Sequence, residues 1–309
     1  MANKSDEIIN EVQKVIHGKE GIIRLTLSAI LGGGHVLLED IPGMGKTTLA
    51  LALSKTMDLD YKRTQFTPDV LPSDICGFNM YDKELGEFRF IEGSIYTNLF
   101  LADEINRTSP KTQSALLEVM EEGCVSVEGV TRTLDKPFFV IATENPFGSS
   151  GTQKLPESQL DRFMICLSIG YPDRESAIKI LKNNSSDALL TVNRVVSKEE
   201  LLIMQQEAEN VEVSERLYDY IINLTEKTRN PAVYDLGLSP RGSISLLKMA
   251  KAYAYCNNRS FITPDDIMDV FIPVCIHRVH LSSKSKAGGL MLINALQSTL
   301  KSVPIPGIE

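Results

Sequence analysis

The sequence predicts an α/β domain, with a parallel sheet covered on both faces by helices, followed by an all-helical second domain. Two observations predict this fold class. Apolar strand-like runs alternate with helical periodicity as far as about residue 170, which is typical of a parallel sheet between two helical layers. Beyond residue 173 the strand signals stop and apolar residues recur at helical spacing. We therefore expect one domain over residues 1–172 and a second over residues 173–309.

Five runs in the first domain have the composition of buried or half-buried strands, and helical stretches separate most of them. These runs are HVLLE (35–39), YKRTQF (61–66), TNLFLAD (97–103), PFFVIAT (137–143) and FMICLSI (163–169).

In the second domain, four segments have apolar residues at i, i+3 and i+4, which predicts amphipathic helices over residues 197–209, 214–229, 239–258 and 263–279. The last begins with a clear start signal, because Thr263 is a capping residue, Pro264 takes the first helical position and two acids follow in the first turn.

Length, charge and composition narrow the function classes. A chain of 309 residues suits two domains, each with its own core. Lys and Arg number 32 against 40 Asp and Glu, so the net charge of −8 disfavours non-specific attraction to nucleic acid or anionic membrane, but allows a local basic patch. The polar N-terminus and the lack of a run of about 18 apolar residues predict a soluble, cytoplasmic protein without membrane insertion. The five scattered cysteines and four histidines match no metal-ligand spacing.

The segment EDIPGMGKTT at residues 39–48 nearly matches the phosphate-binding pattern G-x-x-x-x-G-K-[ST], except that Asp40 stands where the first glycine is expected. Gly43 and Gly45 can adopt φ above zero, so that consecutive backbone N–H groups turn inward onto phosphate oxygens. The following helical segment adds free N–H donors and the positive end of a helix dipole. The loop predicts a nucleotide site, although on pattern alone a glycine-rich turn with a chance lysine is the alternative.

Within this loop, Lys46 is expected to reach the β- and γ-phosphates of ATP, and the Thr47 hydroxyl to ligate Mg²⁺. Asp40 needs only a turn-compatible backbone, and its carboxylate can accept a hydrogen bond from the loop backbone. The candidate nucleotide-binding residues of the loop are Pro42, Gly43, Met44, Gly45, Lys46, Thr47 and Thr48.

A second motif places two acids, Asp103 and Glu104, at the carboxyl end of an apolar strand, the edge of the sheet where the loop is expected. There Asp103 would hold Mg²⁺, directly or through water, and Glu104 would polarise the water that attacks the γ-phosphate. A solvated acidic pair is the alternative for this motif alone. Asn145 follows the next buried strand, where its amide could hydrogen-bond the attacking water or the γ-phosphate, although Asn-Pro more often forms a turn.

Six segments in chain order give the sequence a resemblance to AAA+ ATPases, and specifically to the MoxR family. The segments are GGGHVLLEDIPGMGKTTLA, RTQFTPDVLPSDICG, LADEINRTSPKTQSALLEVMEEG, IATENP, LPESQLDRFM and GLSPRG. The family often carries aspartate in place of the first loop glycine, as Asp40 does here. The resemblance implies a five-stranded parallel sheet domain and a helical lid, with ATP at their junction. It also implies that His17 and Gly18 lie near the adenine, although a helix-ending His-Gly is the alternative.

The resemblance assigns roles to two arginines. Arg162 matches the arginine finger, which in such rings reaches the γ-phosphate of the neighbouring subunit, and Arg241 matches the lid arginine called sensor 2, which contacts the same phosphate from the lid side. Arginine suits both positions because its planar, permanently charged group can bridge phosphate oxygens. From its local sequence alone, Arg241 is equally a surface residue.

Two stretches read as hairpins, because alternating runs flank turn residues at Glu84–Gly86 and at Glu128–Gly129. The resemblance implies that they contact substrates or neighbouring subunits, with plain edge decoration as the alternative.

The implied function is Mg²⁺-dependent ATP hydrolysis in a homo-oligomeric ring, expected to be a hexamer, that remodels a protein client in a chaperone-like way. The expected client is a protein with a von Willebrand factor A domain or a metal-dependent complex, and no nucleic acid is expected. Two alternatives stay open: a nucleic-acid-stimulated AAA+ motor or loader, and a nucleotide-gated scaffold that does not hydrolyse ATP.

Overall fold

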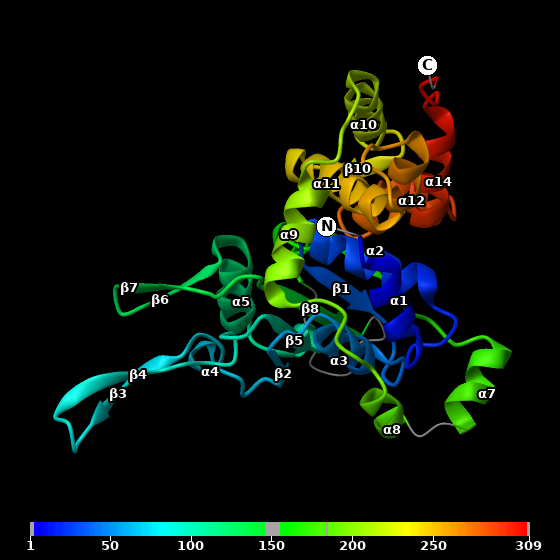
Figure 1. Cartoon of the computed structure of the whole chain (residues 1–309). Helices are drawn as coiled ribbons and strands as arrows, with labels where there is room; N and C mark the ends of the chain where they lie inside the picture. Colours follow the sequence, from blue (N-terminus) through cyan, green and yellow to red (C-terminus); the bar gives the residue numbers. More distant parts are fainter. Residues whose placement is uncertain (1–2, 146–154, 183–184, 308–309) are drawn as a thin grey trace.

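A computed structural model describes residues 3–145, 155–182 and 185–307 of the chain (Figure 1). Its centre is a sheet of five parallel strands in the order β2-β5-β8-β1-β9. All five predicted strands are present, as β1 (Val36–Glu39), β2 (Tyr61–Gln65), β5 (Leu99–Asp103), β8 (Phe139–Glu144) and β9 (Ile165–Leu167).

Helices cover both faces of this sheet. On one face lie α1 (Ser5–Gln13), α2 (Glu20–Leu31) and α3 (Lys46–Thr56), whose apolar residues join one core cluster. On the other face lie the short α4 (Pro72–Cys76) and α5 (Pro110–Glu122), which belong to a second cluster. Strand β5 divides its side chains between the two, with Leu99 and Leu101 in the first cluster and Phe100 and Ala102 in the second, as the two-residue period of a strand requires.

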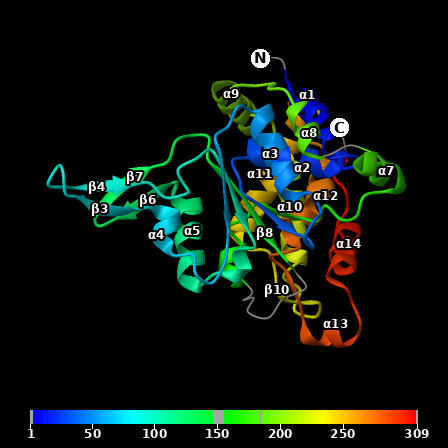
Figure 2. The same ribbon diagram turned by 90° about the horizontal axis from the view of Figure 1, so that it is seen from below.

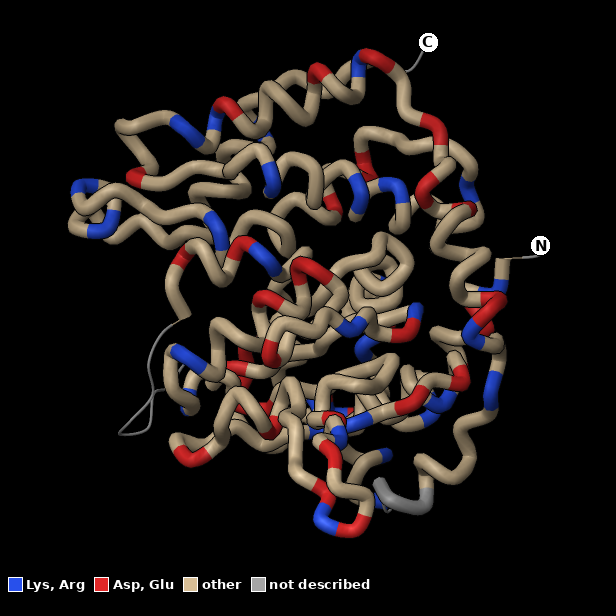
Figure 3. The backbone as a smooth tube through the Cα atoms, turned by 90° about the vertical axis from the view of Figure 1, so that its left-hand side faces the viewer, with Lys and Arg blue, Asp and Glu red and all other residues tan. Residues whose placement is uncertain are grey.

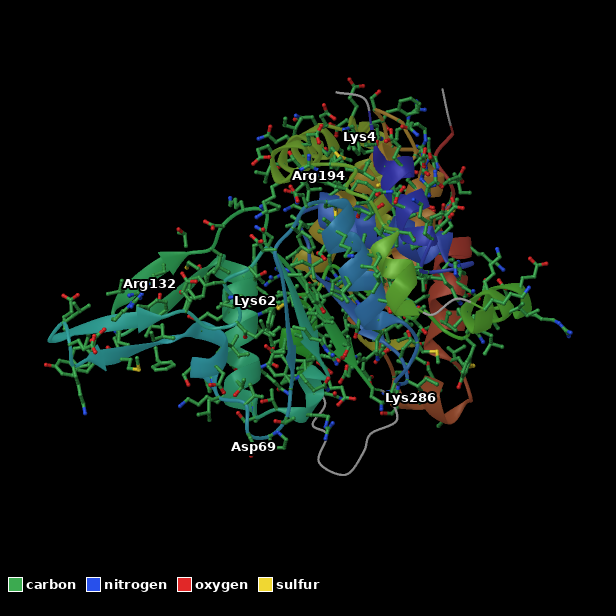
Figure 4. The ribbon with its side chains drawn as sticks, turned by 60° about the horizontal axis from the view of Figure 1, so that its bottom comes forward. Lys4, Lys62, Asp69, Arg132, Arg194 and Lys286 are labelled. Atoms are coloured by element: carbon green, nitrogen blue, oxygen red, sulfur yellow. The ribbon has the colours of Figure 1, made fainter. Side chains whose placement is uncertain are left out.

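Two hairpins extend from the α5 side of the sheet, side by side (Figure 2). They are β3–β4 (Phe78–Asp82 with Glu87–Ile91) and β6–β7 (Cys124–Val127 with Val130–Thr133). The two hairpins predicted from the sequence are therefore confirmed. The hairpins contact each other through side chains. Asn79 Nδ2 donates to Glu128 Oε2 at 2.7 Å. The guanidinium of Arg132, a residue labelled in Figure 4, lies 3.8 Å from the centre of the Phe90 ring.

All four predicted helices of the second domain are present, as α9 (Lys198–Glu209), α10 (Glu215–Lys227), α11 (Pro240–Cys256) and α12 (Pro264–Cys275). The remaining helices are α6 (Glu157–Leu160), α7 (Arg174–Lys182), α8 (Ser185–Leu190), α13 (Ser283–Ala287) and α14 (Leu292–Ser302), together with the 3-10 turn Ile105–Arg107. The expected all-helical fold needs one addition, an antiparallel pair of strands β10 (Tyr234–Leu236) and β11 (His280–Leu281). These strands are too short to produce a periodic signal in the sequence.

The helices from α9 onward pack onto the α2 side of the sheet: α11 contacts both α2 and α9, and α12 contacts β9. One apolar core runs from the sheet into these helices. The division of the chain at residues 172 and 173 therefore stays a prediction.

Acidic and basic residues are interspersed along the chain (Figure 3). None of the helices in the described ranges is long and apolar enough to span a bilayer.

Candidate nucleotide-binding site

The loop between β1 and α3 has the backbone expected of a phosphate cradle. Gly43 and Gly45 both have φ of +86°, the left-handed conformation that disfavours any side chain. Gly45 is the N-cap of α3, so Lys46 and Thr47 stand in the first turn of an 11-residue helix. The loop therefore presents a helix N-terminus, with its free N–H donors, at the carboxyl edge of the sheet.

Lys46 is held at this position. Its side chain is buried, and Nζ donates to the backbone carbonyl of Asp40 at 2.6 Å. Burial lowers the pKa of Lys46, although the negative charges of Asp40, Asp103 and Glu104 act in the opposite direction. An arriving phosphate could therefore replace the Asp40 carbonyl as the acceptor of the hydrogen bond that Lys46 Nζ donates.

From the sequence we expected the carboxylate of Asp40 to accept a hydrogen bond from the backbone of its own loop. The structure shows different partners. The carboxylate accepts hydrogen bonds from Ser168 Oγ at 2.9 Å, from Gly170 N at 3.2 Å and from Ile169 N. The reason is the strand order: β9 lies beside β1, so the chain that leaves β9 passes the end of β1. Asp40 thus fastens the phosphate loop to the segment that follows β9.

Asp103 and Glu104 lie at the carboxyl end of β5, as predicted. Asp103 is buried and accepts from Thr143 Oγ1 and from Arg63 Nη2, each at 2.6 Å. Glu104 has φ of +57°, and its backbone N–H donates to the same Thr143 hydroxyl at 2.8 Å. One threonine of β8 thus fixes both acids. Sequence reasoning missed it because Thr143 reads there as one more residue of a buried strand.

The Glu104 carboxylate forms an ion pair with Arg107, with Oε2 and Nη1 2.6 Å apart. Left-handed backbone at a residue with a side chain is uncommon, and such strain is concentrated at functional sites. Arg107, three residues on, holds the Glu104 carboxylate through this ion pair.

Asn145 directly follows β8, whose Glu144 pairs with Glu39 of β1. It therefore lies at the same edge of the sheet as the phosphate loop. The segment before α2 also reaches the loop: Ile16 packs against Gly45, since a Cβ added to this glycine would lie 3.6 Å from Ile16 Cδ1. Gly18, two residues after Ile16, has φ of +69°, and a Cβ there would be 2.4 Å from Ser176 Oγ. The segment with His17 and Gly18 thus lies between the loop and α7, while its adenine role stays a prediction.

Arg162 and Arg241 lie elsewhere. Both pair with one carboxylate, that of Glu121 in the last turn of α5: Arg162 Nε is 3.2 Å from Oε2, and Arg241 Nη1 is 2.8 Å from Oε1. Arg162 precedes β9 by three residues, and Arg241 stands in the first turn of α11.

These arginines are at the amino ends of the strands, opposite the phosphate loop. The residue before Glu121, Met120, has its carbonyl 2.9 Å from Nε2 of His35, which immediately precedes β1. Lys46 lies beyond the other end of β1, which spans about 13 Å at 3.3 Å per residue. Arg241 and the phosphate loop of one chain therefore lie at opposite edges of the sheet, while the expectation of ATP at the junction of the two domains stays a prediction.

Comparison with known proteins agrees with this architecture. Residues 35–165 match the family model described as ATPase family associated with various cellular activities (AAA), and residues 226–291 match the AAA lid domain. Chaperone MoxR1 of Mycobacterium tuberculosis is 34% identical in an alignment 313 positions long, which covers 98% of this chain and 83% of MoxR1. The chain belongs to the MoxR family of AAA ATPases.

Two further proteins extend the comparison. The uncharacterized protein YeaC of Bacillus subtilis is 44% identical over 299 residues, covering 96% of this chain and 93% of YeaC. A solved structure from Cytophaga hutchinsonii, described only as a candidate ATPase, is 40% identical with a TM-score of 0.91, covering 99% of this chain and 96% of its own. Membership of this ATPase family implies that the chain binds a nucleotide.

Proposed function

We propose that this MoxR-family chain forms a ring, hydrolyses ATP with Mg²⁺ and uses the energy to remodel a protein client. The observation that carries the proposal is the separation of the chemical groups between two edges of one sheet. Lys46 and Glu104 lie at the carboxyl edge, while Arg162 and Arg241 lie at the amino edge. Two copies that meet edge to edge would bring the two sets together around one nucleotide.

At the carboxyl edge, Pro42 would begin the loop, the N–H groups of residues 43–48 would bind phosphate oxygens, and Lys46 would be the cation. The Thr47 hydroxyl and the Asp103 carboxylate are oxygen ligands of the kind Mg²⁺ prefers, so the residues fit that ion. When bound, Mg²⁺ neutralises charge on the phosphates. Arg63, which now pairs with Asp103, would exchange its partner for the phosphates or solvent.

Glu104 is the proposed base for the attacking water, and Asn145 the amide that orients this water. The pairing with Arg107 holds the Glu104 carboxylate, so it must loosen before Glu104 can accept a proton. Arg162 and Arg241 of a neighbouring copy would stabilise the charge that develops on the γ-phosphate.

The client is proposed to be a protein, because a relative of this family is named a chaperone and because the β3–β4 hairpin exposes large apolar side chains. Among them, Phe88 is 71% exposed, with Met80 and Tyr81 on the same hairpin also exposed. Such surfaces mark protein contacts. A partner with a von Willebrand factor A domain remains the specific proposal, and a purified domain of this kind should stimulate the ATPase more than double-stranded DNA does.

Subunit mixing tests the ring mechanism. Glu104→Gln chains lack the base but carry the arginines, whereas Arg162→Ala chains carry the base but lack the finger. Each should be nearly inactive alone, since arginine fingers contribute roughly 10³ to 10⁵ in rate. A mixture should regain activity with an optimum at intermediate ratios, because some interfaces then join an intact base to an intact finger. If labelled chains prove to exchange and the mixture is still no more active than the sum of its parents, the proposal fails.

A further inference from the structure

We propose that Glu121 is a positioning residue that gathers Arg162 and Arg241 into one phosphate-binding unit before a neighbouring nucleotide arrives. This inference rests on the proposed function. Glu121 is not part of the phosphate loop or the acidic pair, and it lies at the opposite edge of the sheet from both. Its two carboxylate oxygens are divided between the two arginines, Oε2 to Arg162 at 3.2 Å and Oε1 to Arg241 at 2.8 Å.

The two segments that carry the arginines are linked to each other by side chains of neighbouring residues. Asp161, the neighbour of Arg162, accepts from Ser239 Oγ at 2.9 Å, and Ser239 is the N-cap of the helix that begins just before Arg241. Asp161 also accepts from Nε of the buried Arg278 at 2.7 Å. The two arginines therefore start from fixed points, and only their long side chains need orientation.

Glu121 itself has a rigid support. His35 is buried and bridges two elements, since its Nδ1 accepts from Val140 N at 2.9 Å while Nε2 lies 2.9 Å from the Met120 carbonyl. With Nδ1 as an acceptor, Nε2 must carry the proton and donate. The last turn of α5 is thus tied to the start of β1, and the Glu121 side chain leaves from a fixed position.

The charges explain why a carboxylate is needed. Two guanidinium groups in one place repel each other, and each has many rotamers to choose from. A carboxylate between them removes the repulsion and makes both groups converge, much as two oxygens of a phosphate would. The side chains of Arg162, Arg241 and Glu121 are 26%, 42% and 40% exposed, so a phosphate of another copy can reach the pair.

The test repeats the mixing of Glu104→Gln and Arg162→Ala chains, with Glu121→Gln added to only one of the two chains at a time. Glutamine keeps the size but loses the charge, and its amide nitrogen cannot accept from a guanidinium. In the Glu104→Gln chain, which supplies the arginines, we expect kcat of the mixture to fall about tenfold, equivalent to about 1.4 kcal/mol, with KM for ATP unchanged. In the Arg162→Ala chain, which supplies the base, the same substitution should leave kcat within about twofold.

Glu122→Gln is the matched control, because it makes the same charge change at the next residue of the same helix turn and has no ion pair among the residues that the structure describes. It should leave the mixture unchanged in either chain. An equal loss from Glu121→Gln in both chains would mean a general structural role and would overturn the inference, as would an unchanged or increased kcat. If the mixture without Glu121→Gln is itself inactive, the ring mechanism fails, and the positioning role fails with it.

Discussion

Replacing Asp40 by alanine should destabilise the fold, and the structure sets the size of the effect. The substitution removes a buried carboxylate that accepts from one hydroxyl and two backbone N–H groups of the segment after β9. A hydrogen bond to a charged group contributes about 1.5 to 3 kcal/mol, and contributions in one network are not additive. We expect Asp40→Ala to lower the free energy of unfolding by about 3 to 5 kcal/mol.

Asp40→Asn should cost about half as much, because its amide oxygen can still accept one or two of these bonds. Urea unfolding followed by circular dichroism is the suitable assay, since the chain contains no tryptophan. Asp60→Asn is the control. It removes an exposed ion pair to Lys198, which should be worth less than about 1 kcal/mol. If Asp40→Ala proves no less stable than this control, the Asp40 carboxylate does not fasten the phosphate loop, and the role that we assign to Asp40 is incorrect.

Three further outcomes are expected. Calorimetric titration should find ATP binding lost in Lys46→Ala but within about tenfold of wild type in Asp40→Gly, because the Lys46 ammonium bonds to the backbone carbonyl of residue 40. Glu104→Gln should bind ATP and retain it unhydrolysed, so wild-type turnover in this variant would assign the base elsewhere. Burial lowers the pKa of His35 from 6.5 to about 4, so its neutral form stabilises the fold above about pH 6.5. About 3 kcal/mol of that stabilisation should be lost as the pH falls towards 4. A His35→Leu variant should not show this loss, and an equally steep pH dependence in the variant would contradict the assignment.

The elements of this fold could be predicted because each has a local signal. The five sheet strands are apolar runs, the capping sequence at Thr263 starts α12, and the turn at Glu128 and Gly129 joins β6 to β7. The short strands β10 and β11 could not be predicted, because they hold together only through the pairing that the surrounding helices impose.

The partners of the site residues were beyond sequence reasoning for a different reason. Asp40 is 128 residues from Ser168, and Glu121 is 120 residues from Arg241. Both pairs depend on which strands and helices become neighbours in space, and no spacing along the chain encodes that. The loop, the acids and the arginines could be named individually, whereas their distribution between two edges required the structure.

That distribution has a consequence for how activity depends on assembly. The edge with Lys46 and the edge with Arg162 are different surfaces, so the proposed contact between copies would be head to tail. In an open row of n chains, the first chain would offer a base that meets no finger and the last a finger that meets no base, leaving n − 1 complete sites. Closing the row into a ring would complete the missing site without any change in sequence. Dilution should therefore reduce the turnover per chain before it reduces the nucleotide bound per chain.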